Sequence, residues 1–297
     1  MEMFATTSAA HRRTSDCIIV GVYVNGKPGF GAADVDAASH GLIGKLVKQG
    51  DISGRPGTSH MLTSVDGVRA KRVLVIGLGK VSEFNIAAFR RAVTTAATQV
   101  KGSKISNLVS YLGLEPVADT SPYYLARYTL ESIGNVLYTF SQTKSGRRPK
   151  APALKKVGIA AASRGDASKA ERGASHGFAI SNGMSLAKDL GNLPPNVCTP
   201  AYLAKTAQQL GRQHKNLSTR VLNEPEIKKL GMHSFLSVTA GTTLPAKLIL
   251  AVGGSIECDA NRTNENAIGD RETSTGRTDR TRQHFSGSHR RNSVARR

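Results

Sequence analysis

Short apolar runs alternate with amphipathic stretches along the first 165 residues of the chain. Runs rich in β-branched and aliphatic residues are typical of buried strands, and they are CIIVGVYV (17–24), MLTSV (61–65), KRVLVIGLG (71–79), 105–112 and 155–162. Apolar residues at helical spacing between these runs predict helices over 33–49, from Ser82 to about Val100, and over 123–140. This alternation predicts an α/β domain over residues 1–165, with a mostly parallel sheet that carries helices on both faces.

The pattern changes after residue 165. Residues 167–190 have the spacing of one long helix and precede the prolines of NLPP (192–195), so we assign 166–191 to an interdomain helix. Thr199 can cap a further helix that carries Pro200 in its first turn, where a missing N–H has no cost. The residues that follow predict strands at 219–222, 234–238 and 247–252, and a short helix between Asn223 and Gly231. We therefore expect residues 192–252 to begin a second α/β domain and to leave it incomplete.

Residues 253–297 differ in composition from the rest of the chain. They contain nine Arg and no Lys, and their few apolar residues follow no period. Such a segment cannot bury enough apolar surface to offset an ordering entropy of roughly 1–2 kcal/mol per residue, so we expect a disordered tail. The abrupt change in composition favours a reading-frame change or an unrelated extension.

The net charge of +20 favours anionic partners, and nucleic acid above all. The loop SGRRPKAPALKK (145–156) is basic, and its candidate phosphate-contacting residues are Arg147, Arg148, Lys150, Lys155 and Lys156. A solvated linker is the alternative interpretation of this loop. Weak, sequence-independent DNA binding is therefore one hypothesis for the function of the chain.

Other chemical signals in the sequence are weaker. The three cysteines lie far apart without a C-x-x-C pair, which is typical of a reducing cytosol, so we expect a cytoplasmic protein. No run reaches the roughly 18 apolar residues of a membrane span, and no membrane partner is expected. The run VLVIGLGK (73–80) lacks the third glycine of a dinucleotide-binding loop, which favours an ordinary strand-to-helix turn over cofactor binding.

The segment after the long predicted helix resembles a known family. ISNGMSLAKDLGNLPPNVCTPAYLAKTA (180–207) and LNEPEIKKLGMHSFLSVTAGT (222–242) resemble the bacterial leucyl (cytosol) aminopeptidases, as do ISGRPGT (52–58) and AKRVLVIGLGK (70–80). The likeness covers about residues 17–252. It implies a macro-domain-like N-terminal domain followed by the start of a catalytic domain. It also implies homohexamers in which two divalent cations, zinc, manganese or magnesium, support removal of N-terminal residues from peptides. Some bacterial members of the family bind DNA, and macro-domain-like ADP-ribose binding is a further possibility by analogy of fold alone.

The sequence departs from this family where the family's metal ligands lie. Those ligands belong to a GKGITFDTGG-like segment and to NTDAEGR, and neither occurs here. Between Asn192 and Val252 the only acidic residues are Glu224 and Glu226, whereas two bridged cations need several converging carboxylates. We therefore assign no catalytic residue, no metal ligand and no cofactor to this chain. We interpret it as a truncated or frameshifted member of the family that is inactive, although an enzyme with a relocated metal site remains the alternative.

Overall fold

The computed structural model describes residues 1–143, 145 and 151–253. Arg147, Arg148 and Lys150, and the predictions for the tail beyond Gly253, lie outside the described residues. The chain forms two compact units, of which the first comprises Met1–Leu203 and the second begins at Ala204.

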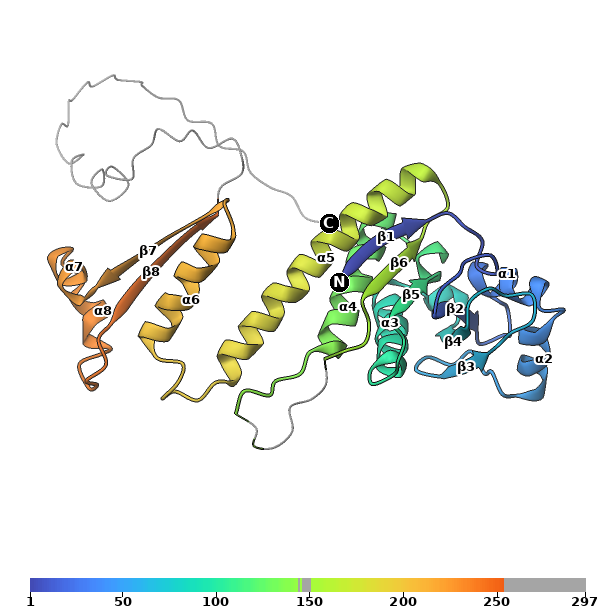
Figure 1. The fold of residues 1–297 in the computed structure, drawn as a ribbon, viewed down its shortest axis with the longest axis horizontal. Helices are drawn as coiled ribbons and strands as arrows, with labels where there is room; N and C mark the ends of the chain where they lie inside the picture. Colours follow the sequence, from blue (N-terminus) through green and yellow to red (C-terminus); the bar gives the residue numbers. More distant parts are fainter. Residues whose placement is uncertain (144, 146–150, 254–297) are drawn as a thin grey trace, which may run out of the picture. The chain divides into compact units, whose positions relative to one another are not determined.

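A six-stranded sheet organises the first unit (Figure 1). The strand order is β1-β6-β5-β2-β4-β3, and every neighbouring pair is parallel except β3 with β4. The strands are β1 (Glu2–Thr6), β2 (Cys17–Tyr23), β3 (Ser59–Thr63), β4 (Arg72–Gly79), β5 (Asn107–Ser110) and β6 (Lys156–Ala160). The prediction of an α/β fold with a mostly parallel sheet is confirmed.

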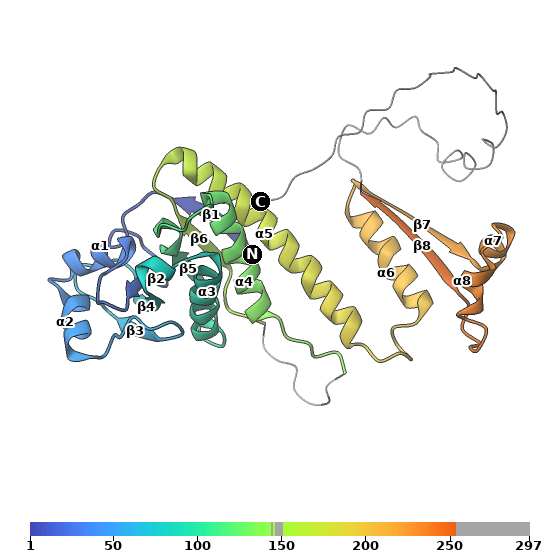
Figure 2. The same ribbon diagram turned by 180° about the vertical axis from the view of Figure 1, so that it is seen from behind.

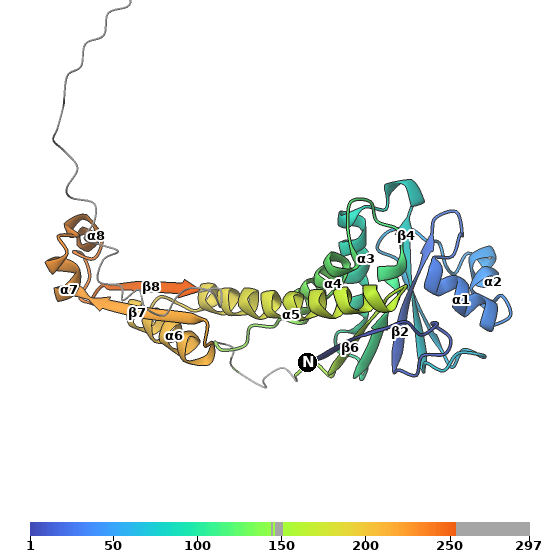
Figure 3. The same ribbon diagram turned by 90° about the horizontal axis from the view of Figure 1, so that it is seen from above.

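Helices cover both faces of this sheet, as Figure 3 shows. Alternate residues of β2 explain the two layers, because successive side chains of a strand point to opposite faces. Ile18 and Val20 pack in one core with α1 (Phe30–Ala38) and α2 (Leu42–Gln49). Ile19 packs in the other core with residues of α3 (Ile86–Val100), α4 (Pro122–Leu137) and α5 (Arg164–Asn192).

Two helix boundaries in the first unit differ from the sequence predictions. The helix predicted over 33–49 is broken between α1 and α2, where His40 and Gly41 adopt left-handed backbone angles with φ of 54° and 80°. Ser82 lies in a single 3₁₀ turn (Val81–Glu83) and caps no α-helix. Asn85 caps α3 instead, because its side-chain oxygen accepts a hydrogen bond of 3.0 Å from the Ala88 amide.

The long helix α5 packs closely along α4 by means of small residues. A Cβ atom at Gly173 would collide with the carbonyl oxygen of Tyr123, and one at Gly177 would collide with that of Arg127. Farther along the pair, Gly134 of α4 leaves room for the side chain of Ser181. Residues four positions apart lie on one face of a helix, so the small residues of α5 form one face. Along this face the backbones of α4 and α5 come close together.

The second unit is built on the antiparallel pair β7 (Leu217–Asn223) and β8 (Lys247–Gly253), which Figure 2 shows beside α6 (Pro200–Gln213). The predicted Thr199 cap of α6 is present, since its hydroxyl accepts a hydrogen bond of 3.3 Å from the Tyr202 amide. The predicted short helix after Asn223 is α7 (Glu224–Lys229). Between α7 and β8, the strand predicted at 234–238 is wrong, because this segment forms the short helix α8 (His233–Ser237).

Candidate functional site

The two acidic residues in the described part of the second unit hold backbone groups. Glu226 completes a capping box at the start of α7, where its Oε2 atom accepts a hydrogen bond of 2.8 Å from the Asn223 amide. Glu224 accepts a hydrogen bond of 2.7 Å from the Ala246 amide and thereby ties α7 to the residue before β8. The carboxylates are therefore directed to two different backbone sites and do not converge.

Metal-ligating side chains do not gather elsewhere in the part of the chain that the structure describes. No group of three or more His, Cys, Asp or Glu residues lies close enough together there to hold a metal ion. Cys17 is fully buried, and burial raises the pKa of its thiol to about 12, which disfavours the thiolate that would bind a metal. The described residues thus do not fit the pair of divalent cations that the family resemblance implies.

The glycines of VLVIGLGK (73–80) allow the segment 52–58 to pack closely against them. The Gly77 amide donates a hydrogen bond of 3.0 Å to the Thr58 carbonyl, and the Gly79 amide donates one of 2.9 Å to the Gly54 carbonyl. A Cβ atom at Gly77 would collide with the carbonyl oxygen of Arg55. Both glycines therefore lie within β4, which continues to Gly79, and their amides pair with the segment 52–58, so the turn predicted at these glycines does not begin before Lys80.

A buried carboxylate lies at the carboxyl edge of the sheet. In open α/β sheets, ligands bind outside the carboxyl ends of the strands, where the strand order reverses. Here the Glu115 carboxylate accepts hydrogen bonds of 2.9 Å from the Tyr23 hydroxyl and 2.8 Å from the Phe30 amide at the start of α1. Glu115 is only 3% exposed, and its burial raises its pKa. An acidic side chain at this helix N-terminus is unfavourable for a phosphate-bearing ligand such as ADP-ribose.

The amino edge of the sheet carries lysines from two segments. Lys155 and Lys156 precede or begin β6, and both of their amides donate hydrogen bonds to the Ser106 carbonyl. Lys155 and Lys156 are both exposed, and the Lys156 ammonium is paired with Glu2 at 2.7 Å. Lys104 lies two residues before Ser106 and is also exposed. Of the five predicted phosphate-contacting residues, the structure therefore describes two, and it pairs one of them with a carboxylate.

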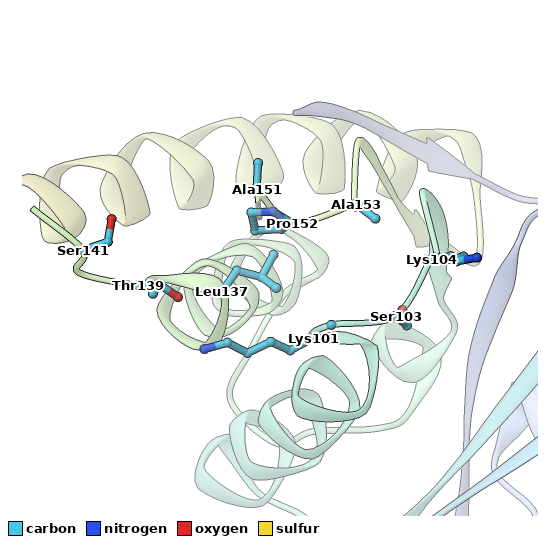
Figure 4. Close-up of a pocket in the computed structure, with 10 residues that line it drawn as sticks. Lys101, Ser103, Lys104, Leu137, Thr139, Ser141, Ala151, Pro152 and Ala153 are labelled. Atoms are coloured by element: carbon cyan, nitrogen blue, oxygen red, sulfur yellow. The ribbon is translucent and has the colours of Figure 1, made fainter. Parts of the chain in front are cut away.

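A cavity of about 540 Å³ opens beside this edge (Figure 4). It is lined by Lys101, Gly102, Ser103, Lys104, Leu137, Thr139, Ser141, Ala151, Pro152 and Ala153. Lys101 donates a hydrogen bond of 2.7 Å from Nζ to the Val136 carbonyl at the end of α4. The sequence analysis did not single out Lys101 and Lys104, although the motif KGSK between a predicted helix and a predicted strand could have suggested them.

Comparison with protein families covers both units. The N-terminal domain of the cytosol aminopeptidase family matches residues 19–147, and the catalytic domain of the same family matches residues 185–254. The chain belongs to the cytosol aminopeptidase family. No helix in the described segments has the length and apolar character needed to cross a bilayer.

Curated members of the family are similar to the chain over about half of their own length. The probable cytosol aminopeptidase of Paraburkholderia phytofirmans is 40% identical over 236 residues, which are 80% of this chain and 46% of the relative. That of Ralstonia nicotianae is 39% identical over 250 residues, which are 83% of this chain and 49% of the relative. The chain thus spans about half the length of the curated family members it matches.

Solved structures with a similar fold include a leucine aminopeptidase and a bottromycin maturation enzyme. A tomato leucine aminopeptidase mutant superposes with a TM-score of 0.70 at 22% identity, over 87% of this chain and 52% of that one. The bottromycin maturation enzyme BotP in complex with Mn superposes with a TM-score of 0.62 at 22% identity, over 80% of this chain and 45% of that one. At this identity the likeness establishes the fold alone.

Proposed function

We propose that this chain is a member of the cytosol aminopeptidase family that has no aminopeptidase activity by itself. The observation that carries the proposal is the use of Glu224 and Glu226 as backbone hydrogen-bond acceptors in the segment that matches the catalytic domain. Peptide hydrolysis by two metals requires carboxylates that bridge ions about 3.5–4 Å apart, and these two carboxylates hold other groups. The chain then supplies a scaffold, with an N-terminal domain over 1–165, an interdomain helix over 166–191 and the first elements of a catalytic domain over 192–252.

Membership of the family supports a second proposal, which concerns the activity from which this chain derives. We infer that the ancestral activity is metal-dependent release of N-terminal residues from peptides, in a cytosolic homohexamer. Manganese, zinc or magnesium would be the cofactor of that activity. Relatives named probable cytosol aminopeptidases support this inference.

Hydrolysis of leucine p-nitroanilide in the presence of manganese, zinc or magnesium tests the main proposal. The purified chain should show no metal-dependent turnover, while the Paraburkholderia phytofirmans relative, assayed in parallel, serves as the positive control. Turnover by the purified chain that EDTA abolishes and manganese restores would overturn the proposal, provided that it persists after removal of host peptidases.

A second candidate function is weak binding of nucleic acid at the amino edge of the sheet. The exposed ammonium groups of Lys104 and Lys155 and the net charge of +20 favour it. Contacts to phosphate alone give dissociation constants of about 10⁻⁴–10⁻⁶ M at physiological salt, with affinity that falls as salt rises. Substitution of the two neighbouring lysines tests the site. Lys155→Ala should weaken binding of a DNA duplex more than Lys156→Ala, because the charge of Lys156 is already paired with Glu2. Binding that is insensitive to salt, or equal losses in the two variants, would contradict this candidate.

A further inference from the structure

The two edge strands of the six-stranded sheet have different surroundings. At the β1 edge, α5 packs along the strand, and the Ala5 amide donates a hydrogen bond of 3.2 Å to the Glu171 carboxylate of that helix. At the other edge, β3 pairs with β4 alone, and among the described residues no strand lies on its outer side (Figure 1). Within the described part of the chain, β1 is therefore covered, whereas the outer side of β3 can accept a partner strand.

The hydrogen bonds that flank β3 show which of its backbone groups face β4. In an antiparallel pair, the positions that exchange hydrogen bonds with the partner alternate along each strand. The Gly77 amide donates to the Thr58 carbonyl just before β3, and the Ser64 amide donates to the Lys71 carbonyl just after it. The even-numbered positions of this segment are therefore the ones bonded to β4.

The outward positions of β3 are Ser59, Met61 and Thr63. Their amides and carbonyls point away from β4, and no hydrogen bond from another described residue reaches them. The side chains of β3 contact both cores of the first unit, because Met61 packs against the core that contains α3 residues and Leu62 against the core that α2 covers. A strand added at this edge would therefore continue the sheet between its two helical layers.

The sequence of β3 lacks the usual protection of an edge strand. Edge strands are commonly kept from pairing with other chains by charged side chains, by proline or by a bulge. The five residues SHMLT contain no Lys, Arg, Asp, Glu or Pro, and their register with β4 is regular throughout. Each outward residue thus offers an N–H donor and a C=O acceptor for the main-chain pairing by which extended peptides add to a sheet edge.

The charge around β3 favours an acidic partner over a second copy of the chain. Residues 51–72 include four basic and two acidic residues, which are Arg55, Arg69, Lys71 and Arg72, and Asp51 and Asp66. The whole chain carries a net charge of +20. A second copy would bring the same positive charge to this edge, whereas a peptide that carries carboxylates would be attracted to it.

We propose that the outer edge of β3 binds an extended acidic peptide as an added strand, with the backbone groups of Ser59, Met61 and Thr63 as its partners. Main-chain hydrogen bonds hold the peptide, and its carboxylates select it over neutral or basic peptides. The site lies in the part of the chain that matches the N-terminal domain of the family, and it does not depend on whether the chain hydrolyses peptides.

Three end-blocked octapeptides test the proposal on the unchanged chain, with binding followed by the fluorescence anisotropy of a label on the peptide. The first alternates glutamate and valine, and the second replaces each glutamate by lysine. The third is the acidic peptide with two adjacent central amides N-methylated, which blocks both of its edges because adjacent amides point in opposite directions. The first peptide should bind about tenfold more tightly than either of the others, on the scale of one or two hydrogen bonds. Equal binding of the two acidic peptides would overturn the proposal, because charge alone would then explain the binding.

Substitutions at Thr63 locate the site on the chain. Thr63→Pro removes an outward amide and directs the proline ring towards the added strand, whereas Thr63→Ala keeps the amide. The Thr63 side chain is exposed and its amide does not pair with β4, so this edge position tolerates proline. Thr63→Pro should bind the acidic peptide about tenfold more weakly than Thr63→Ala. Equal affinities of the two variants would overturn the proposal.

Hydrogen exchange gives a second readout that requires no substitution. Exchange in residues 59–63 should slow when the acidic peptide saturates the chain, and the N-methylated peptide at the same concentration should leave it unchanged. Unchanged exchange in this segment under saturating acidic peptide would overturn the proposal. Dimers that form without peptide and that Thr63→Pro disrupts would overturn it as well, because the partner of β3 would then be a second copy.

Discussion

At the scale of single residues, Glu115 couples the folding of the first unit to pH. Burial is the largest influence and raises its pKa, whereas the hydrogen bonds from Tyr23 and Phe30 act in the opposite direction. A carboxyl group whose pKa is raised by folding contributes stability that is fully present below its unfolded pKa of about 4.3. That contribution is lost as the pH rises through the folded pKa.

We predict that Glu115→Gln removes this pH dependence, because an amide does not titrate. The free energy of unfolding of Glu115→Gln, minus that of the unchanged chain, should become more positive as the pH rises above about 4.3. Urea denaturation at a series of pH values, followed by tyrosine fluorescence, measures this difference in the free energy of unfolding. A difference that stays constant with pH would contradict the assignment.

Asp16 provides a control, because its contribution to stability should change with pH in the opposite direction to that of Glu115. Hydrogen bonds from Lys71 and Ser106 hold the pKa of Asp16 far below its ordinary value. A group with a lowered folded pKa stabilises the fold above its unfolded pKa, so the deficit of Asp16→Asn should shrink as the pH falls below about 3.9.

Glu115 could not be identified from the sequence, because its hydrogen-bond partners are far from it along the chain. Its partners Tyr23 and Phe30 are 92 and 85 positions away, and no local pattern connects them. The pairing of Lys156 with Glu2 is hidden in the same way, because β1 and β6 meet only in the folded sheet. The features recognised from the sequence were local ones, such as the Thr199 cap at the start of α6.

At the scale of elements, the contact between α4 and α5 depends on the absence of side chains at particular positions. Gly173 faces the Tyr123 carbonyl, whereas Gly183 of the same helix has nothing within 4 Å of the place where its Cβ atom would lie. The two glycines therefore form a matched pair for the same substitution.

We predict that Gly173→Ala destabilises the first unit by roughly 1–3 kcal/mol, because the added methyl group meets backbone that cannot move aside. Gly183→Ala should instead stabilise it by roughly 0.5–1 kcal/mol, since alanine loses less backbone entropy than glycine in a helix. Urea denaturation of both variants measures the two free energies of unfolding. Equal effects of the two substitutions would show that the helices are not packed as described.

The elements that sequence predicted well are those with an unambiguous burial pattern. All seven residues of β2 are buried, so its apolar run is continuous and easily read. Only Thr6 of the five residues of β1 is buried, and this edge strand leaves no periodic signal. The segment 234–238 is too short for its apolar residues to distinguish a helix from a strand, and packing of Leu236 against the core of the second unit decides in favour of a helix.

At the scale of the whole molecule, the two units differ greatly in the size of their cores. The sheet of the first unit is covered on both faces, whereas the fully buried apolar core of the second unit among the described residues consists of Leu222, Ile227 and Ala246. A two-stranded sheet is marginally stable by itself, and in the described part of the chain β7 and β8 pair only with each other, so the outer edge of each strand has no strand partner there. Val252 of β8 is 61% exposed.

We predict slow hydrogen exchange in Val73–Gly77 and fast exchange in Leu248–Val252, because β4 is paired on both sides, with β2 and β3, whereas β8 has one partner strand among the described residues. Limited proteolysis should leave a core of about residues 1–190, and the second unit should self-associate at raised concentration. Equal protection of Leu248–Val252 and Val73–Gly77 in a monomer would contradict this prediction and show that β8 is protected by contacts other than its pairing with β7.

We propose that this member of the cytosol aminopeptidase family holds no pair of divalent cations. Equilibrium dialysis against manganese or zinc, followed by elemental analysis of the protein, tests it most directly and requires no assumption about substrate. We predict no stoichiometric metal in the purified chain, because Glu224 and Glu226 hold the Ala246 and Asn223 amides. Two equivalents of metal per chain that resist buffer exchange and are removed by a chelator would contradict the account.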